Sequence, residues 1–188
     1  MVPLTSLLLP VVASAVAVFL LSSVIHMVLT HHRHDVRRLP ADKEDAILDA
    51  LRRLDASPGD YAAPHAGGPA GMNDPVFVAK ATKGPMAFIT LAPGAAPSIG
   101  PNLAQWFVYC IVVGIFVAYV AGLVFGLGAA FPAVLRVVSA VAFLAYSMAL
   151  PQASIWFRRS WATTLRSMGD SLLYGLATGA VFAWLWPK

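Results

Sequence analysis

Four long apolar stretches, separated by polar segments, dominate the pattern of this chain. The second of them holds 24 residues, Gln105 to Gly128, without one charged side chain. At about 1.5 Å of rise per residue such a helix is long enough to cross a hydrocarbon core of about 30 Å. The stretches cover residues 4–30, 102–128, 130–157 and 167–186. This pattern predicts an all-α integral membrane protein with four transmembrane helices.

The long polar segment, residues 31–101, predicts a small α/β module inserted between the first two membrane helices. Residues 42–54 have helical periodicity, with Asp42 as the expected N-cap. They place an apolar stripe on one helix face, made of Ile47, Leu48, Leu51 and Leu54. That stripe needs a partner, which is another part of the loop, the membrane surface or another subunit.

Two more elements are expected in the same module. Asn73, Asp74 and Pro75 form a cap followed by a proline in the first turn, which predicts a short helix that continues to Lys83. Residues 60–64 and 86–91 have strand composition and predict a two-stranded ribbon. A ribbon of that size is marginal by itself.

Small residues recur every four positions in two of the apolar stretches. This spacing puts them on one helix face, where they let a second helix approach closely in lipid. The expected packing positions are Gly114, Ala118, Gly122, Gly126, Gly175 and Gly179. Pro151 is expected to kink the third stretch.

The first stretch also resembles a cleavable signal peptide, with Ala13, Ser14 and Ala15 as a cleavage site. We expect it to be retained as a span, because no positive charge precedes it and the apolar run continues well past Ala15.

Composition supports a membrane protein and argues against a nucleic-acid partner. Hydrophobic residues make up 59% of the 188 residues and charged residues 12%. The net charge of +4 arises outside residues 31–100, where positive and negative side chains balance. The single cysteine, Cys110, has no partner for an intrachain disulfide and is expected to be an inert apolar side chain.

The basic residues predict the orientation. They cluster after the first and third stretches, and basic loops stay in the cytoplasm. We therefore expect a bacterial inner-membrane protein with both termini periplasmic and residues 31–101 cytoplasmic. The arginines expected to contact lipid headgroups are Arg33, Arg37, Arg38, Arg158 and Arg159.

Histidines supply the candidate chemistry. His26 lies within the first apolar stretch and is a candidate ligand of a haem or chlorophyll-type pigment. The alternatives are a hydrogen bond to Ser22, Thr30 or a neighbouring helix, and simple exposure at the membrane interface. His31 and His34 are candidate metal ligands, with a solvated polar turn as the alternative. No cofactor is predicted outright.

Asp170 is expected to pair with Arg166 one helical turn earlier. A proton-relay carboxylate is the alternative. The chain contains none of the common nucleophile, metalloprotease, phosphate-loop or Cys-pair motifs, so we expect no enzymatic activity and identify no soluble substrate.

Along nearly its whole length the chain resembles a group of uncharacterised small bacterial inner-membrane proteins. The resemblance rests on SSVIHM (22–27), RRLP (37–40), PGDY (58–61), KGP (83–85), WFVYC (106–110) and SIWFRRSW (154–161). It implies an integral membrane protein and no assigned activity.

The leading functional expectation is a non-catalytic accessory or scaffold subunit of a larger inner-membrane complex, respiratory or photosynthetic. Its partners would be other membrane subunits and lipids. The alternatives are a small transporter or channel acting as a homo-oligomer and a haem- or metal-binding electron-transfer subunit.

Overall fold

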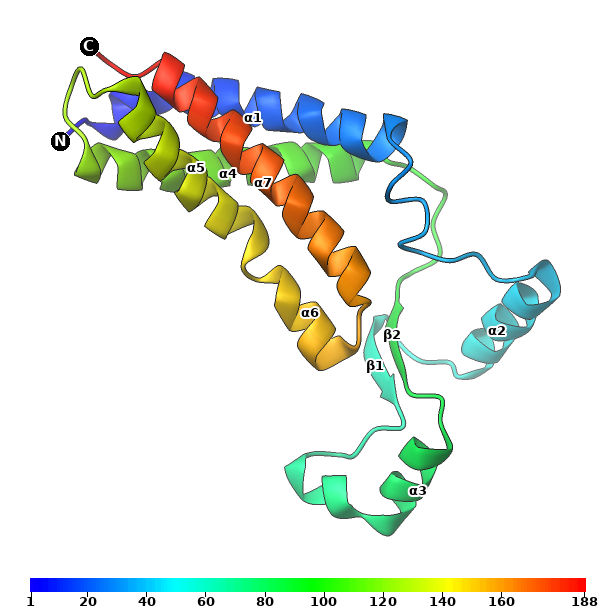
Figure 1. Cartoon of the computed structure of the whole chain (residues 1–188). Coiled ribbons are helices and arrows are strands. Elements are labelled where there is room, and N and C mark those ends of the chain that lie inside the picture. The colour runs from blue at the N-terminus through cyan, green and yellow to red at the C-terminus, as the bar shows by residue number, and fades with distance from the viewer. The chain divides into compact units, whose positions relative to one another are not determined.

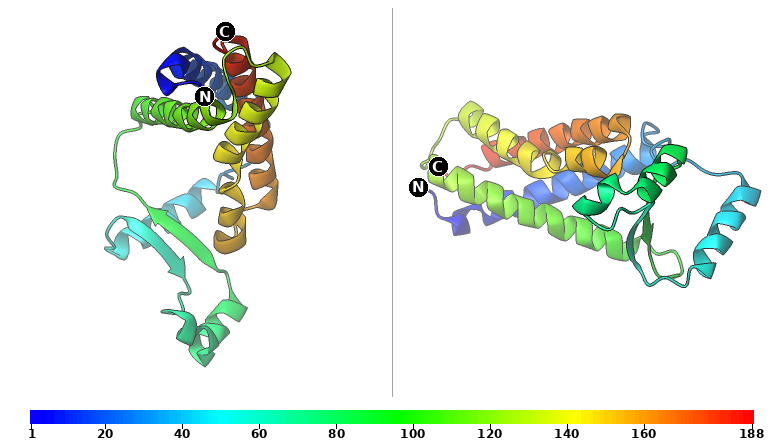
Figure 2. Two further views of the ribbon diagram at one scale, coloured as in Figure 1. Left: turned by 90° about the vertical axis from the view of Figure 1, so that its left-hand side faces the viewer. Right: turned by 90° about the horizontal axis from the view of Figure 1, so that it is seen from below.

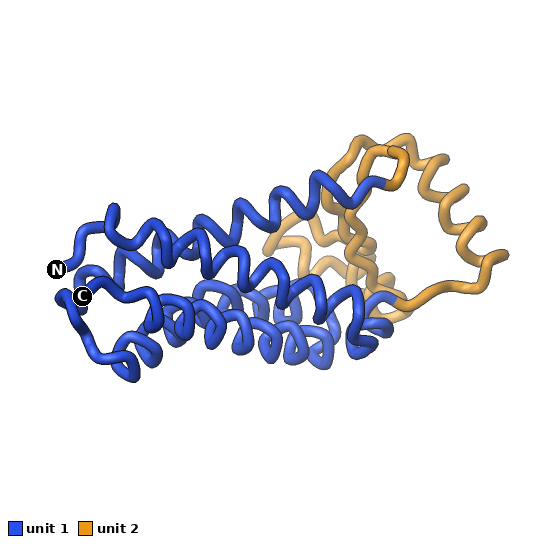
Figure 3. Tube along the Cα trace, turned by 90° about the horizontal axis from the view of Figure 1, so that it is seen from above, with its two compact units in different colours: residues 1–36, 98–188 blue, residues 37–97 orange.

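The computed structural model describes residues 1–188 and divides them into two compact units, which Figure 3 distinguishes by colour. One unit contains residues 1–36 and 98–188 and is entirely helical, and the other contains residues 37–97. The helical unit consists of η1 (Leu4–Leu7), α1 (Leu8–Ser23), η2 (Val24–Val28), α4 (Gly100–Val124), α5 (Phe131–Ser147), α6 (Leu150–Phe157) and α7 (Trp161–Trp184).

Three helical segments are long and apolar enough to cross a membrane: Leu4–Val28, Gly100–Val124 and Phe131–Phe157. They coincide closely with the first three stretches expected from the sequence. The fourth, α7, has the length of a span and begins six residues earlier than expected. Its apolarity is lower because Arg166, Asp170 and several hydroxyl side chains interrupt it, so four membrane spans are not confirmed.

The helices of this unit lie side by side (Figures 1 and 2). The most extensive pairing joins α5 to α7, and α1 contacts both α4 and α7. The core between them is built largely of small and branched side chains such as Val18, Val117 and Val138, with Phe182 as a buried aromatic residue. Close packing of apolar side chains and small residues is what holds helices together where lipid replaces water.

Most of the expected packing glycines lie at close helix contacts. A Cβ atom at Gly114 would be 3.2 Å from Val11 of α1, and one at Gly122 would be 2.6 Å from the Val2 carbonyl oxygen. Gly175 and Gly179 face α5 in the same way, and Ala118 is fully buried. The expectation for Gly126 is wrong, because it follows the end of α4 and a Cβ there would meet nothing.

Both termini lie at the same end of the helical unit (Figure 1). The Val2 amide donates to the Gly122 carbonyl over 3.0 Å, and the Gly128 amide donates to the Pro187 carbonyl over 2.8 Å. The indole of buried Trp186 donates to the Gly126 carbonyl. These bonds join the N-terminus to the last turn of α4 and the C-terminus to the loop that follows α4.

The expected break at Pro151 is confirmed. Helix α5 ends at Ser147 and α6 starts at Leu150. The proline has no N–H to donate and its ring crowds the carbonyl four residues earlier, so the regular helix cannot run through.

The second unit has the four expected elements, α2 (Ala41–Arg53), β1 (Gly59–Ala63), α3 (Pro75–Lys83) and β2 (Ala87–Leu91). It also contains a short 3-10 helix that was not expected, η3 (Pro69–Asn73). The ribbon is confirmed, and its antiparallel register pairs Gly59 with Leu91 and Ala63 with Ala87. The start of α3 is confirmed as well, since the Asp74 side chain accepts from the Val76 amide. Asp42 is not the N-cap of α2, because Pro40 occupies that position.

The tight contact between α5 and α7 can be tested with two glycines of the same helix. A Cβ at Gly175 would lie 2.8 Å from the Ser139 carbonyl oxygen, whereas one at Gly169 would meet nothing within 4 Å. We expect Gly175→Ala to lower stability by about 1–3 kcal/mol through overpacking. Gly169→Ala is the matched control and should be neutral or slightly stabilising, since alanine favours the helix. Unfolding in mild detergent measures both, and equal effects would contradict the contact.

Candidate functional site

The end of the first membrane helix changes its winding where it carries His26. Helix α1 continues into η2, a π-helical turn in which the Leu29 amide donates to the Val24 carbonyl five residues back. Such turns redirect side chains and are frequent at functional sites. The Nδ1 atom of His26 lies 3.0 Å from the Ser22 carbonyl oxygen, as one of the expectations for this residue had it. Because a carbonyl only accepts, Nδ1 carries a proton, and Nε2 is the ring nitrogen left to coordinate a metal.

His32 lies between two carboxylates. Its Nδ1 is 2.7 Å from Asp35 and its Nε2 is 2.6 Å from Asp170. Since an ionised carboxylate only accepts, both ring nitrogens donate and the ring is an imidazolium. Burial opposes this charge, but the hydrogen bonds to Asp35 and Asp170 outweigh it and raise the pKa of His32 above its ordinary value.

Asp35 is held from its other side by α7. The Arg166 guanidinium donates to it through Nε at 3.0 Å and through Nη2, and the Thr163 hydroxyl donates over 3.3 Å. Burial would raise the pKa of Asp35, yet the hydrogen bonds from His32 and Arg166 lower it below its ordinary value. The carboxylate is therefore ionised and oriented.

Asp170 is the buried acid of the site, with 8% of its side chain exposed. Its second oxygen lies 3.2 Å from Nε2 of His31. The expected pair between Arg166 and Asp170 is wrong, because Arg166 binds Asp35 and Asp170 binds the two histidines. The reason is tertiary, since residues 31–35 approach the same face of α7 and offer both side chains better partners than each other.

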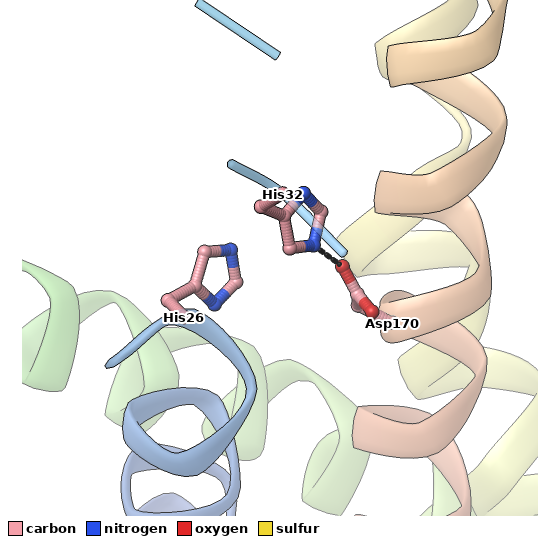
Figure 4. Close-up of side chains that lie close together, drawn as sticks. All are labelled: His26, His32 and Asp170. Atoms are coloured by element: carbon pink, nitrogen blue, oxygen red, sulfur yellow. Dashed lines mark hydrogen bonds and ion pairs between the residues drawn. The ribbon is translucent and has the colours of Figure 1, made fainter. Parts of the chain in front are cut away.

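Three side chains from different elements converge at this point, as Figure 4 shows. The rings of His26 and His32 are stacked, with centroids 4.6 Å apart and planes within 6°. One potential ligand atom each from His26, His32 and Asp170 lies within 4.8 Å of the others. Two imidazoles and a carboxylate suit the divalent transition metals.

The groups behind these three side chains also suit a metal. Histidines that bind a metal commonly donate their other ring N–H to a carbonyl or carboxylate, which fixes the ring and raises its basicity. Here His26 donates to the Ser22 carbonyl and His32 to Asp35, and Asp35 is in turn fixed by Arg166.

The structure assembles this group differently from the sequence expectation. His31 contacts Asp170, but His34 is exposed, accepts a hydrogen bond from Arg33 over 2.9 Å and lies outside the cluster. His32 and Asp170 were not among the expected metal ligands. The sequence does mark Asp170 as a candidate site residue, because it is the single acidic residue within the apolar stretches. The five arginines expected at lipid headgroups are all exposed.

A cavity of about 370 Å³ lies against the cluster and is also lined by His26 and Asp170. Its walls come from α1 and η2, α4, the α5–α6 break and α7, all in the helical unit. Most of the lining surface is apolar, and its polar part comes from serine and tyrosine hydroxyls together with His26 and Asp170.

Comparison with known protein families, with curated proteins and with solved structures finds no match for this chain. The resemblance to uncharacterised bacterial inner-membrane proteins therefore stays a prediction, and the function has to be argued from the site itself.

The exchange of ion-pair partners gives a direct test. In double-mutant cycles of Asp35→Asn with Arg166→Gln we expect a coupling of about 0.5–3 kcal/mol, because the two side chains share hydrogen bonds. The cycle of Asp170→Asn with Arg166→Gln is the control and should give a clearly smaller coupling. Denaturant unfolding in mild detergent measures both. A larger coupling for Asp170 would restore the pairing that the sequence alone indicates.

Proposed function

We propose that this protein is a small inner-membrane protein that binds a divalent transition-metal ion through His26, His32 and Asp170. The observation that carries the proposal is the convergence of these three side chains, from η2, the loop after it and α7, at one end of the helical unit. No two of them are closer than six positions in sequence, so only the fold brings them together.

The charges of the site support this proposal. Asp35 and Asp170 oppose Arg166 and the His32 imidazolium, so the metal-free cluster is balanced. Metal ligands must give up their protons, and an ion bound at Nε2 of His32 displaces the proton that now bonds to Asp170. Replacing one proton by a divalent ion adds a single positive charge. Solvent can reach this charge, because the His31 side of the site is exposed.

The membrane topology we propose has four spans, with α7 as the fourth and both termini periplasmic. Support comes from the hydrogen bonds that join both termini to the C-terminal end of α4 and the loop after it. It also comes from the position of the cluster at the ends of η2 and α7 nearest the basic residues. A lower apolarity of α7 fits this scheme, because its polar face is covered by protein instead of lipid. The metal site then lies at the cytoplasmic surface.

Metal binding is tested on the full chain in mild detergent, stripped with a chelator and titrated with Co²⁺, whose visible absorption reports coordination. We expect one ion per chain. His32→Ala and Asp170→Asn should abolish binding, and Asp35→Asn should weaken it by about 10–100-fold because the imidazole loses its orienting partner.

His34→Ala is the matched control, since it removes an exposed histidine of the same turn and should leave the titration unchanged. Equal binding by all four variants, or no stoichiometric binding by the unaltered chain, would overturn the proposal. The cluster would then serve only as a set of ion pairs that holds residues 31–35 against α7.

A second candidate function is a non-catalytic accessory subunit of a larger membrane complex. The observation that favours it is the second unit, residues 37–97, which contains no buried residue. Its helix α2 exposes Ile47, Leu48 and Leu54 on one face. A module this small cannot bury a core of its own, and a partner subunit would supply the missing surface.

This second candidate predicts that Leu48→Glu releases co-purifying membrane subunits from the chain after gentle extraction from native membranes. Burying the new carboxylate against a partner would cost free energy. Arg53→Gln, the same change in net charge outside the stripe, is the control and should retain them. Mass spectrometry of the co-purified material measures the outcome. The absence of any partner in fixed ratio would count against an accessory role.

A further inference from the structure

The cavity beside the cluster contains a buried hydroxyl group that has no partner. Tyr174 lines the cavity from α7, is 4% exposed and has its hydroxyl oxygen shielded from solvent. No hydrogen bond reaches that oxygen. A buried hydroxyl without a partner costs about 1–3 kcal/mol, and native proteins contain few of them. A ligand in the cavity that accepts this O–H would remove the cost.

The rings around Tyr174 form an aromatic wall. The ring centroids of Trp106 and Tyr146 lie 6.0 and 5.7 Å from that of Tyr174, and they lie 6.2 Å from each other. The indole N–H of Trp106 already donates to the Ser22 hydroxyl over 2.8 Å, so this ring is fixed and offers its face and not its donor. Fixed aromatic rings at this spacing favour a flat ring as the ligand.

Aliphatic side chains form much of the remaining wall, and its polar part comes from His26, Asp170 and four serines. Leu103, Ile99 and Leu150 line the cavity together with Met27. Apolar walls with a few polar groups are typical of small-molecule sites, and about 370 Å³ is in the range of such sites. An anionic ligand would lose its hydration here and would face the carboxylate of Asp170.

We infer that this cavity binds a lipid-soluble molecule with a flat ring that bears a carbonyl oxygen, the chemistry of a quinone headgroup. The carbonyl accepts the hydrogen bond of the Tyr174 hydroxyl, and the ring packs against Trp106 and Tyr146. An alkyl chain alone would fill the same volume but leave the hydroxyl unpaired. The inference rests on the cavity and on Tyr174 and does not require a metal at His32, which is outside the cavity lining.

The test uses the full chain in mild detergent and two probes with the same tail, decylubiquinone and n-decylbenzene, whose ring has no oxygen. Native mass spectrometry counts the bound molecules. We expect one decylubiquinone per chain and at least about tenfold weaker binding of n-decylbenzene, the ratio that one hydrogen bond of about 1.4 kcal/mol provides.

Tyr174→Phe keeps the shape of the wall and removes the hydroxyl, and it should reduce the affinity for decylubiquinone by about tenfold without changing that for n-decylbenzene. Tyr109→Phe is the matched control, because Tyr109 is outside the cavity lining and its hydroxyl bonds to the Ala145 carbonyl. Leu103→Trp fills the cavity and should abolish binding of both probes.

Equal binding of the two probes, or an unchanged affinity in Tyr174→Phe, would overturn the inference in favour of a simple acyl-chain groove. A failure of decylubiquinone to bind at all would overturn it as well. His32→Ala separates this result from the metal proposal, since it should abolish Co²⁺ binding and leave decylubiquinone binding intact.

Discussion

The pairing of the buried carboxylate of Asp170 with the histidines of the loop after α1 is the interaction on which the functional end of this molecule depends. An ionised acid inside an otherwise apolar helix bundle is costly unless charged or donating groups surround it. Here His32 supplies the opposite charge, and Asp35 holds the His32 ring in place. Asp35 is in turn bound by Arg166, which lies on the same helix α7 as Asp170. The chain of pairs starts and ends on α7 and closes the segment after η2 onto it.

The same arrangement explains why the polar residues of α7 do not exclude it from the bundle. Thr163, Arg166 and Asp170 recur at helical spacing, so they form one face, and residues 31–35 cover that face. Further along α7 the helix needs small side chains instead of polar ones, because Gly175 and Gly179 let the backbone of α5 come into contact. One helix therefore combines a polar end that binds the loop with a small-residue end that packs in the bundle.

The proposed metal ligands and the cavity meet at the polar end, and both include His26 and Asp170. The π-helical turn of η2 is the local feature that permits this, because it places the His26 ring beside that of His32. Helix α2 belongs to the other unit and has no buried residue. Its exposed apolar face suggests burial against a partner surface and not coordination of an ion.

Periodicity and length in the sequence by themselves determined three apolar spans, the break before Pro151 and the start of α3, since each depends on nearby residues. Strand composition marked the two segments of the ribbon, although their pairing joins distant positions such as Gly59 and Leu91. Close packing at Gly114, Gly122, Gly175 and Gly179 was also predictable from spacing, whereas Gly126 was not, because spacing does not show where α4 ends. Only the tertiary structure decided the site. Local spacing pairs Arg166 with Asp170 and His31 with His34, but a carboxylate takes the donors that the fold brings nearest, and those come from more than 130 positions away in the chain.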